Sequence, residues 1–166
     1  MVASDAFSSH NRGSMTTTLG KIKTERGAAE RLLTSINGAT SSDELPTFVA
    51  SAATSSDELR RLVHMYKNQW KRWKDQIEED GTCDQDAEKQ AMASYFASDF
   101  SHPNDVEDYC EDLASKLDTV VDRRATEFLS VAQLRLKQTE TNIATASATA
   151  LQSTPSPTAG STVHTP

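Results

Sequence analysis

The segment Leu59–Ile77 constrains the fold of this chain more than any other stretch. Its apolar residues recur at alternating steps of three and four, which is the period of an amphipathic helix packed along other helices. Both tryptophans of the chain lie on this seam, which consists of Leu59, Leu62, Val63, Tyr66, Trp70, Trp73 and Ile77. The segment therefore predicts a helix whose large side chains build a core.

The residues before this seam predict how the helix begins. The sequence ATSSDEL occurs at residues 39–45 and again at 53–59, and each copy has the Ser-x-x-Glu spacing of a capping box. Two interpretations follow: one helix from about Ser42 to Glu79, or a short helix that breaks at the start of the second copy. We favour a continuous or lightly kinked helix, because copies two heptads apart keep their apolar residues in phase.

Three other segments also carry helical periodicity. The first is predicted to start at Thr17, with the threonines as caps, and to end at Asn37-Gly38. Another covers residues 84–100, with Ala87, Ala91, Tyr95 and Phe96 facing inward. The last runs from Val106 to about Gln138. Its apolar stripe is Val106, Tyr109/Cys110, Leu113, Leu117, Val120/Val121, Phe128, Val131 and Leu134.

These segments together predict an all-α fold. We expect an elongated antiparallel bundle of three to four helices over residues 17–140, with two long, coiled-coil-like helices. Residues 1–16 are small and polar and predict a disordered arm. Residues 141–166 hold no Asp, Glu, Lys or Arg and are rich in Ser, Thr and Pro, which predicts a flexible linker or tail.

The helix of the seam is also the most basic part of a chain whose formal net charge is -7. Aromatic residues interleaved with cations suit base stacking and phosphate neutralisation. One hypothesis is therefore a nucleic-acid contact through Arg60, Lys67, Lys71, Arg72 and Lys74. A second hypothesis is contact with a partner protein. Because the rings share one stripe that the cations flank, we favour buried rings and solvated cations.

No residue pattern indicates catalysis or a cofactor. The four histidines are scattered, Cys83 and Cys110 lack zinc-site spacing, and no phosphate loop or Gly-x-Ser-x-Gly motif occurs. The chain also lacks the apolar segments of a signal peptide or membrane span. We expect a cytoplasmic, non-enzymatic protein without cofactor, small-molecule substrate or membrane contact. Its predicted partner is a second copy of itself or another helical protein, to which it serves as an adaptor.

The order of these segments resembles that of a known family. TLGKIKTERGAAERLLTSI, ELRRLVHMYKNQWKRWKDQIEE and DVEDYCEDLASKLDTVVDRRATEFLSV follow one another and precede a Ser/Thr/Pro-rich linker. This layout resembles the N-terminal helical segment of Gag-like polyproteins in Pao/BEL-type LTR retrotransposons, over about residues 17–160. The resemblance implies self-association during particle assembly. The chain has no Cys-Cys-His-Cys knuckle, Asp-Ser/Thr-Gly triplet or polymerase motif, so no catalytic residue is carried over.

Overall fold

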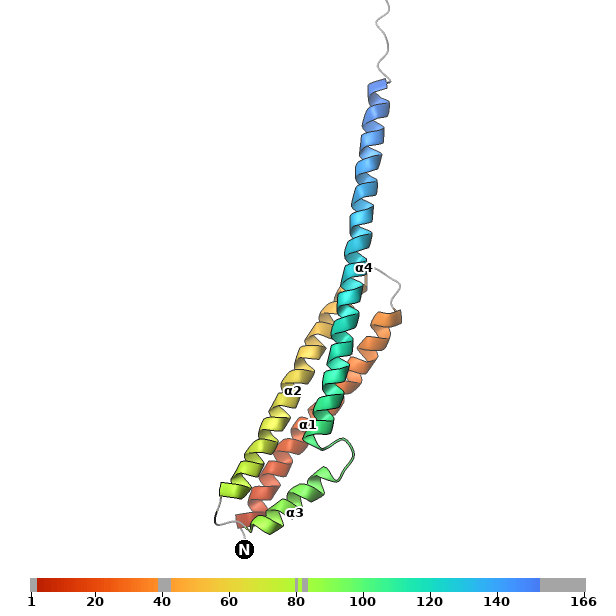
Figure 1. The fold of residues 1–166 in the computed structure, drawn as a ribbon. Coiled ribbons are helices and arrows are strands. Elements are labelled where there is room, and N and C mark those ends of the chain that lie inside the picture. Colours follow the sequence, from red (N-terminus) through yellow and green to blue (C-terminus); the bar gives the residue numbers. More distant parts are fainter. Residues whose placement is uncertain (1–2, 39–42, 80, 82–83, 153–166) are drawn as a thin grey trace, which may run out of the picture. The chain divides into compact units, whose positions relative to one another are not determined.

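The computed structural model describes residues 3–38, 43–79, 81 and 84–152, and within these ranges the chain is all-α, as predicted. The four helices are α1 (Ala3–Gly38), α2 (Leu45–Glu79), α3 (Gln85–Phe96) and α4 (Pro103–Gln152) (Figure 1). The chain forms two compact units, residues 1–125 and residues 126–166. Helix α4 contributes to both units.

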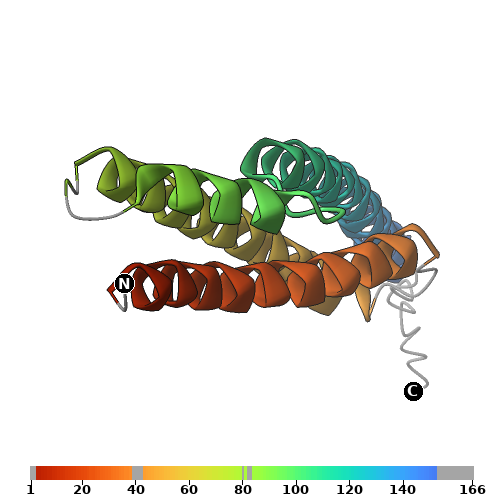
Figure 2. The same cartoon turned by 90° about the horizontal axis from the view of Figure 1, so that it is seen from below.

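In the first unit, polar contacts fix how the helices run. The Asn11 amide of α1 donates to Gln76 of α2 at 3.3 Å, and the Ser55 hydroxyl of α2 donates to Glu25 of α1 at 2.5 Å. The N-terminal part of α1 thus lies beside the C-terminal part of α2, so the two helices are antiparallel (Figures 1 and 2). Residues 103–125 of α4 are in turn antiparallel to α2, because Ser56 bonds Asp118 and Lys67 bonds Glu107.

The core lies between these three helices and uses the stripes that the sequence predicts. Its residues are Met15, Leu19, Ile22, Ala29 and Ile36 of α1, Ala52, Leu59, Leu62, Val63, Tyr66, Trp73 and Ile77 of α2, and Val106, Cys110, Leu113, Leu117 and Val120 of α4. Arg124 of α4 contacts the C-terminal end of α1. Its guanidinium donates to the carbonyls of Ile36 at 3.1 Å and Asn37 at 3.3 Å, which satisfies acceptors at the C-terminus of α1.

Helix α3 is shorter than predicted. Asp84 caps its start by accepting from the Ala87 backbone N–H at 3.2 Å, but the helix ends at Phe96 rather than at Phe100. Phe100 has a left-handed backbone with φ of 54°, which a continuing right-handed helix cannot contain. Its ring lies 5.5 Å from that of Tyr109 and 4.6 Å from the Arg26 guanidinium. The prediction that Ala87 faces inward is wrong, because this residue is exposed in the first turn.

Helix α1 starts well before the predicted Thr17. Residues 3–16 are helical, so the predicted disordered arm is wrong over this range, and only residues 1–2 lie outside the described part. Upstream of Thr17 this helix still contacts α2, because Met15 is fully buried, the Ser14 hydroxyl accepts from the Gln69 amide at 2.9 Å and the Asn11 amide donates to Gln76. The hydroxyls of Thr17 and Thr18 donate to the carbonyls of Gly13 and Ser14 inside the helix and do not cap it.

The continuous form of α2 is confirmed, because one helix runs from Leu45 to Glu79. The second ATSSDEL copy therefore lies inside the helix and caps nothing. Helix α4 reaches Gln152, so residues 141–152, which are predicted as part of a flexible linker or tail, are helical, while residues 153–166 lie outside the described part. Within the described ranges, no helix combines the length and apolar character needed to cross a membrane.

Candidate functional site

The predicted seam forms the interior of the first unit. All of its residues except Trp70 are buried, namely Leu59, Leu62, Val63, Tyr66, Trp73 and Ile77, and so are Leu113, Leu117 and Val120 of the predicted α4 stripe. Trp70 is half-buried at the edge of the core, and its ring centroid lies 6.0 Å from that of His102. The seam therefore packs the chain against itself and is not an open docking surface.

The two buried aromatic residues of α2 have polar partners inside the core. The Tyr66 hydroxyl donates to the Ser101 carbonyl at 2.6 Å, and burial raises the pKa of this phenol well above its usual range. The Trp73 indole N–H donates to the Glu88 carboxylate at 3.4 Å. Tyr66 and Trp73 are therefore not available to stack on nucleic-acid bases, which leaves the half-buried Trp70 as the aromatic residue of this stretch with an accessible ring.

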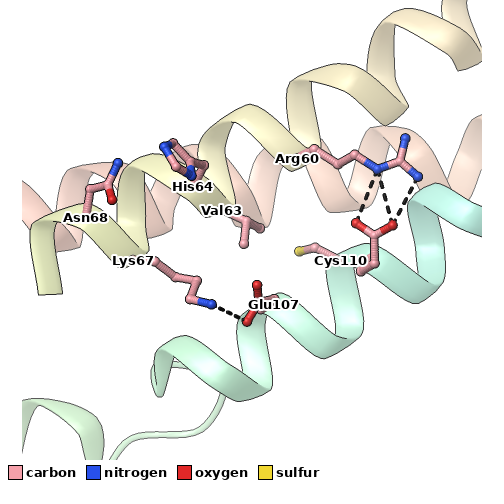
Figure 3. Close-up of a pocket in the computed structure, with 8 residues that line it drawn as sticks. Arg60, Val63, His64, Lys67, Asn68, Glu107 and Cys110 are labelled. Atoms are coloured by element: carbon pink, nitrogen blue, oxygen red, sulfur yellow. Dashed lines mark hydrogen bonds and ion pairs between the residues drawn. The ribbon is translucent and has the colours of Figure 1, made fainter. Parts of the chain in front are cut away.

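Two of the five predicted nucleic-acid cations are bound to carboxylates of α4. Lys67 lies 2.6 Å from Glu107 (Figure 3). Arg60 lies 3.1 Å from Glu111 and 2.8 Å from Asp118. Hydrogen bonds from Arg60 to Glu111 and Asp118 raise the pKa of the guanidinium further. The other three, Lys71, Arg72 and Lys74, are exposed. Nucleic-acid binding stays a prediction, resting on three cations of one helix.

The second ATSSDEL copy supplies part of this ionic contact. The Ser56 hydroxyl donates to Asp118 at 2.7 Å and accepts from Arg60 at 2.9 Å, so one serine joins both charged groups. Partial burial opposes ionisation of Asp118, but the bonds from Ser56 and Arg60 outweigh it and lower its pKa below 3.8. This network fixes the register between α2 and α4.

The lowered pKa of Asp118 gives a testable pH dependence. A carboxyl whose pKa is lower in the folded state contributes stability above its unfolded pKa, and this contribution is lost as pH falls through the folded pKa. We expect Asp118→Asn to lower the free energy of unfolding at pH 7 by less than about 1 kcal/mol, because the pair is solvent-accessible. In urea titrations the difference from the natural chain should begin to shrink as pH falls to about 3.8, and it should vanish only below the lower pKa of the folded state. A difference that stays constant with pH would contradict the assignment.

A groove of about 430 Å³ lies between α2 and α4 next to these ion pairs. Figure 3 shows Val63 and Cys110 between the two helices, with Arg60, His64, Lys67 and Glu107 around them. Burial raises the pKa of the Cys110 thiol to about 11, so the thiol is protonated near neutral pH and is a weak nucleophile. Within the described ranges, no three His, Cys, Asp or Glu side chains are grouped to hold a metal ion. Cys83 lies outside these ranges.

The second unit presents a different kind of surface. Its large apolar side chains between residues 128 and 151 are all exposed, although the helix is uncharged after Glu140. The exposed fractions are 42% for Phe128, 61% for Leu129, 46% for Val131, 66% for Leu134, 66% for Leu136, 61% for Ile143 and 78% for Leu151. A series of exposed apolar residues along one helix is typical of an interaction surface, whereas isolated ones are ordinary.

Three of these residues are spaced by seven and define what we call the apolar row: Leu129, Leu136 and Ile143. The positions between them on the same face are Ala132, Thr139 and Ala146, which are small and uncharged. The sequence prediction followed Phe128, Val131 and Leu134 instead, a stripe that becomes polar at Gln138. The seven-residue spacing was the signal that would have found the apolar row.

No protein-family model, curated protein or solved structure matches this chain.

Proposed function

We propose that this chain is a non-enzymatic helical assembly module. In this proposal the described residues between 3 and 125 form the folded part, and residues 126–152 of α4 present the apolar row to a helix of another protein chain. The observation that carries the proposal is the exposure of Leu129, Leu136 and Ile143, each at 61% or more, on a described helix that is uncharged beyond Glu140. Covering such a face removes apolar surface from water, a gross gain of about 25 cal/mol per Å² that is partly offset by the freedom the two chains lose on association.

The proposal assigns no catalytic residue and no cofactor. The cations that line the groove between α2 and α4 are held by carboxylates, and the buried Cys110 thiol is protonated at neutral pH. We further propose that the module acts in the cytoplasm, in keeping with its two cysteines, which are too few for a disulfide framework.

We also propose that the module belongs to a Gag-like protein of a Pao/BEL-type retrotransposon. The support is the order of a first helix, two long heptad helices and a Ser/Thr/Pro-rich segment. The test is to sequence the native transcript beyond the codon for Pro166. A continuing frame with an Asp-Ser/Thr-Gly protease and a reverse transcriptase is the expected result. A stop codon at that point would overturn this part of the proposal and leave a free-standing module.

Site-specific photo-crosslinking in cells tests the assembly function itself. A photoreactive residue at position 136 lies on the apolar row, and one at position 134 is the matched control, because both leucines are 66% exposed. We expect covalent adducts to protein from position 136 and far fewer from position 134. Absence of adducts from positions 129, 136 and 143 would contradict the proposal.

A further inference from the structure

We infer that the partner of the apolar row is the same row of a second copy of this chain, in a parallel two-stranded coiled coil. The inference rests on the proposed function, which requires only that some protein helix covers this face. It adds the identity of the partner, the direction of its helix and the register of the contact.

The positions along the row are those of a paired helical core. Leu129, Leu136 and Ile143 take the first core position of three successive heptads. Ala132, Thr139 and Ala146, three residues after each of them, take the second. No charged residue stands at any of these six positions, so pairing two copies buries no charge. The small residues at the second position allow the two helices to approach closely.

The charges beside the row decide the direction of the partner. Arg135 stands immediately before Leu136, and Glu140 stands immediately after Thr139, so they flank the row on opposite sides. In a parallel pair in register, a residue flanking a first core position faces the residue five later on the partner helix. Arg135 therefore faces Glu140 of the second copy, and the pair forms twice by symmetry.

An antiparallel pair lacks this complementarity. In that arrangement each flanking position meets the same kind of position on the partner. Arg135 would then face Phe128, Arg135, Asn142 or Thr149, and Glu140 would face Gln133, Glu140 or Ser147. None of these contacts joins opposite charges. The sequence around the row thus favours a second copy in parallel over an antiparallel one.

The other exposed face of this helix is a poorer candidate. Leu134 lies about 160° around the helix from Leu136, because two residues of a 3.6-residue turn separate them. Its neighbours along that face are Val131 and then the polar Gln138, Thr141 and Thr145. Leu134 and Leu136 nonetheless have the same exposed fraction, 66%. They form a matched pair of residues that differ only in the face they occupy.

The first test uses sedimentation equilibrium of the full chain from about 1 µM to about 1 mM, a range that spans weak to moderate dimer affinities. We expect a monomer–dimer equilibrium. Leu136→Gln should raise the dimer Kd at least about 100-fold, because each dimer loses two buried leucines. Leu134→Gln should change it less than about threefold. Equal effects of the two substitutions would overturn the inference.

The second test uses the charges to establish partner identity and direction. Arg135→Glu and Glu140→Arg each place like charges opposite one another in a parallel homodimer. Each should weaken it about tenfold. An equimolar mixture of the two variants should restore dimers, because the heterodimer regains two attractive pairs. One pair joins the two substituted side chains with their charges exchanged, and the other joins the two side chains left unchanged. Failure of the mixture to restore association would overturn the parallel register.

The two proposals fail in different ways. A chain that stays monomeric to about 1 mM overturns the second copy as partner. If position 136 nevertheless gives protein adducts in cells, the assembly function stands with a different helical partner. Absence of both dimers and adducts would remove both proposals.

Discussion

Replacing Trp73 by alanine is expected to lower the free energy of unfolding by about 3–5 kcal/mol. The side chain is fully buried, and its ring lies 6.1 Å from Tyr95 and 6.5 Å from Phe96. The substitution leaves a cavity where α2 meets α3 and removes a hydrogen-bond donor from the buried Glu88 carboxylate. Urea denaturation followed by far-UV circular dichroism measures the loss.

Trp70→Ala is the control, because it removes the same side chain one turn earlier on the same helix. Trp70 is half-buried, so its removal should cost only about 1–2 kcal/mol. Equal losses for the two variants would show that Trp70 and Trp73 contribute alike and would contradict the packing described here. An unchanged midpoint for Trp73→Ala would place its ring in water.

Leu117→Ala carries the second large expected effect, about 2–5 kcal/mol. Leu117 is fully buried among the helices of the first unit, in the part of α4 that pairs with α2. Deleting its side chain loses apolar contacts and leaves a cavity that the surrounding residues fill only in part. The same urea titration, carried out on the full chain, measures the change.

Leu134→Ala is the matched comparison on the same helix, since Leu134 is 66% exposed. Its removal should change the free energy of unfolding by less than about 0.5 kcal/mol. Together the two variants test whether the apolar stripe of α4 changes from core to surface between residues 120 and 128. Comparable losses at Leu117 and Leu134 would mean that the stripe is buried along its whole length.

The α2 seam shows how far local pattern predicts this fold. Apolar residues three and four apart lie on one face of any helix, so the inward residues could be identified without knowing what they contact. Leu59, Tyr66 and Ile77 are buried as expected. The continuous α2 and the end of α1 at Gly38 followed from the same local signals.

Boundaries that depend on packing were predicted less well. The polar N-terminal residues gave no reason to expect a helix before Thr17, yet the helix continues upstream to include Met15, which packs in the core. The Ser-x-x-Glu of the second repeat copy is a capping pattern by spacing. In the structure its serines instead contact Glu25 and Asp118, which lie far away in sequence.

The pairing of the α2 cations and the burial of the two tryptophans also depend on residues that are distant in the sequence. The basic run of α2 has no acid within it, so the sequence could not show that Arg60 and Lys67 meet carboxylates of α4, 40 to 58 residues further on. Nor could periodicity separate Trp73 from Trp70, because both occupy the same stripe. The position of α3, which contributes Tyr95 and Phe96 around Trp73, made that difference.

The sequence by itself determined that this chain is helical and which face of α2 turns inward, because helical periodicity is a property of neighbouring residues. Only the tertiary structure decided which apolar residues remain exposed. The stripe of α4 is buried as far as Val120, just before Arg124 meets the end of α1, and the side chains from Phe128 onward are exposed. Burial requires a partner surface, and a partner surface is a property of the assembled helices rather than of any one segment.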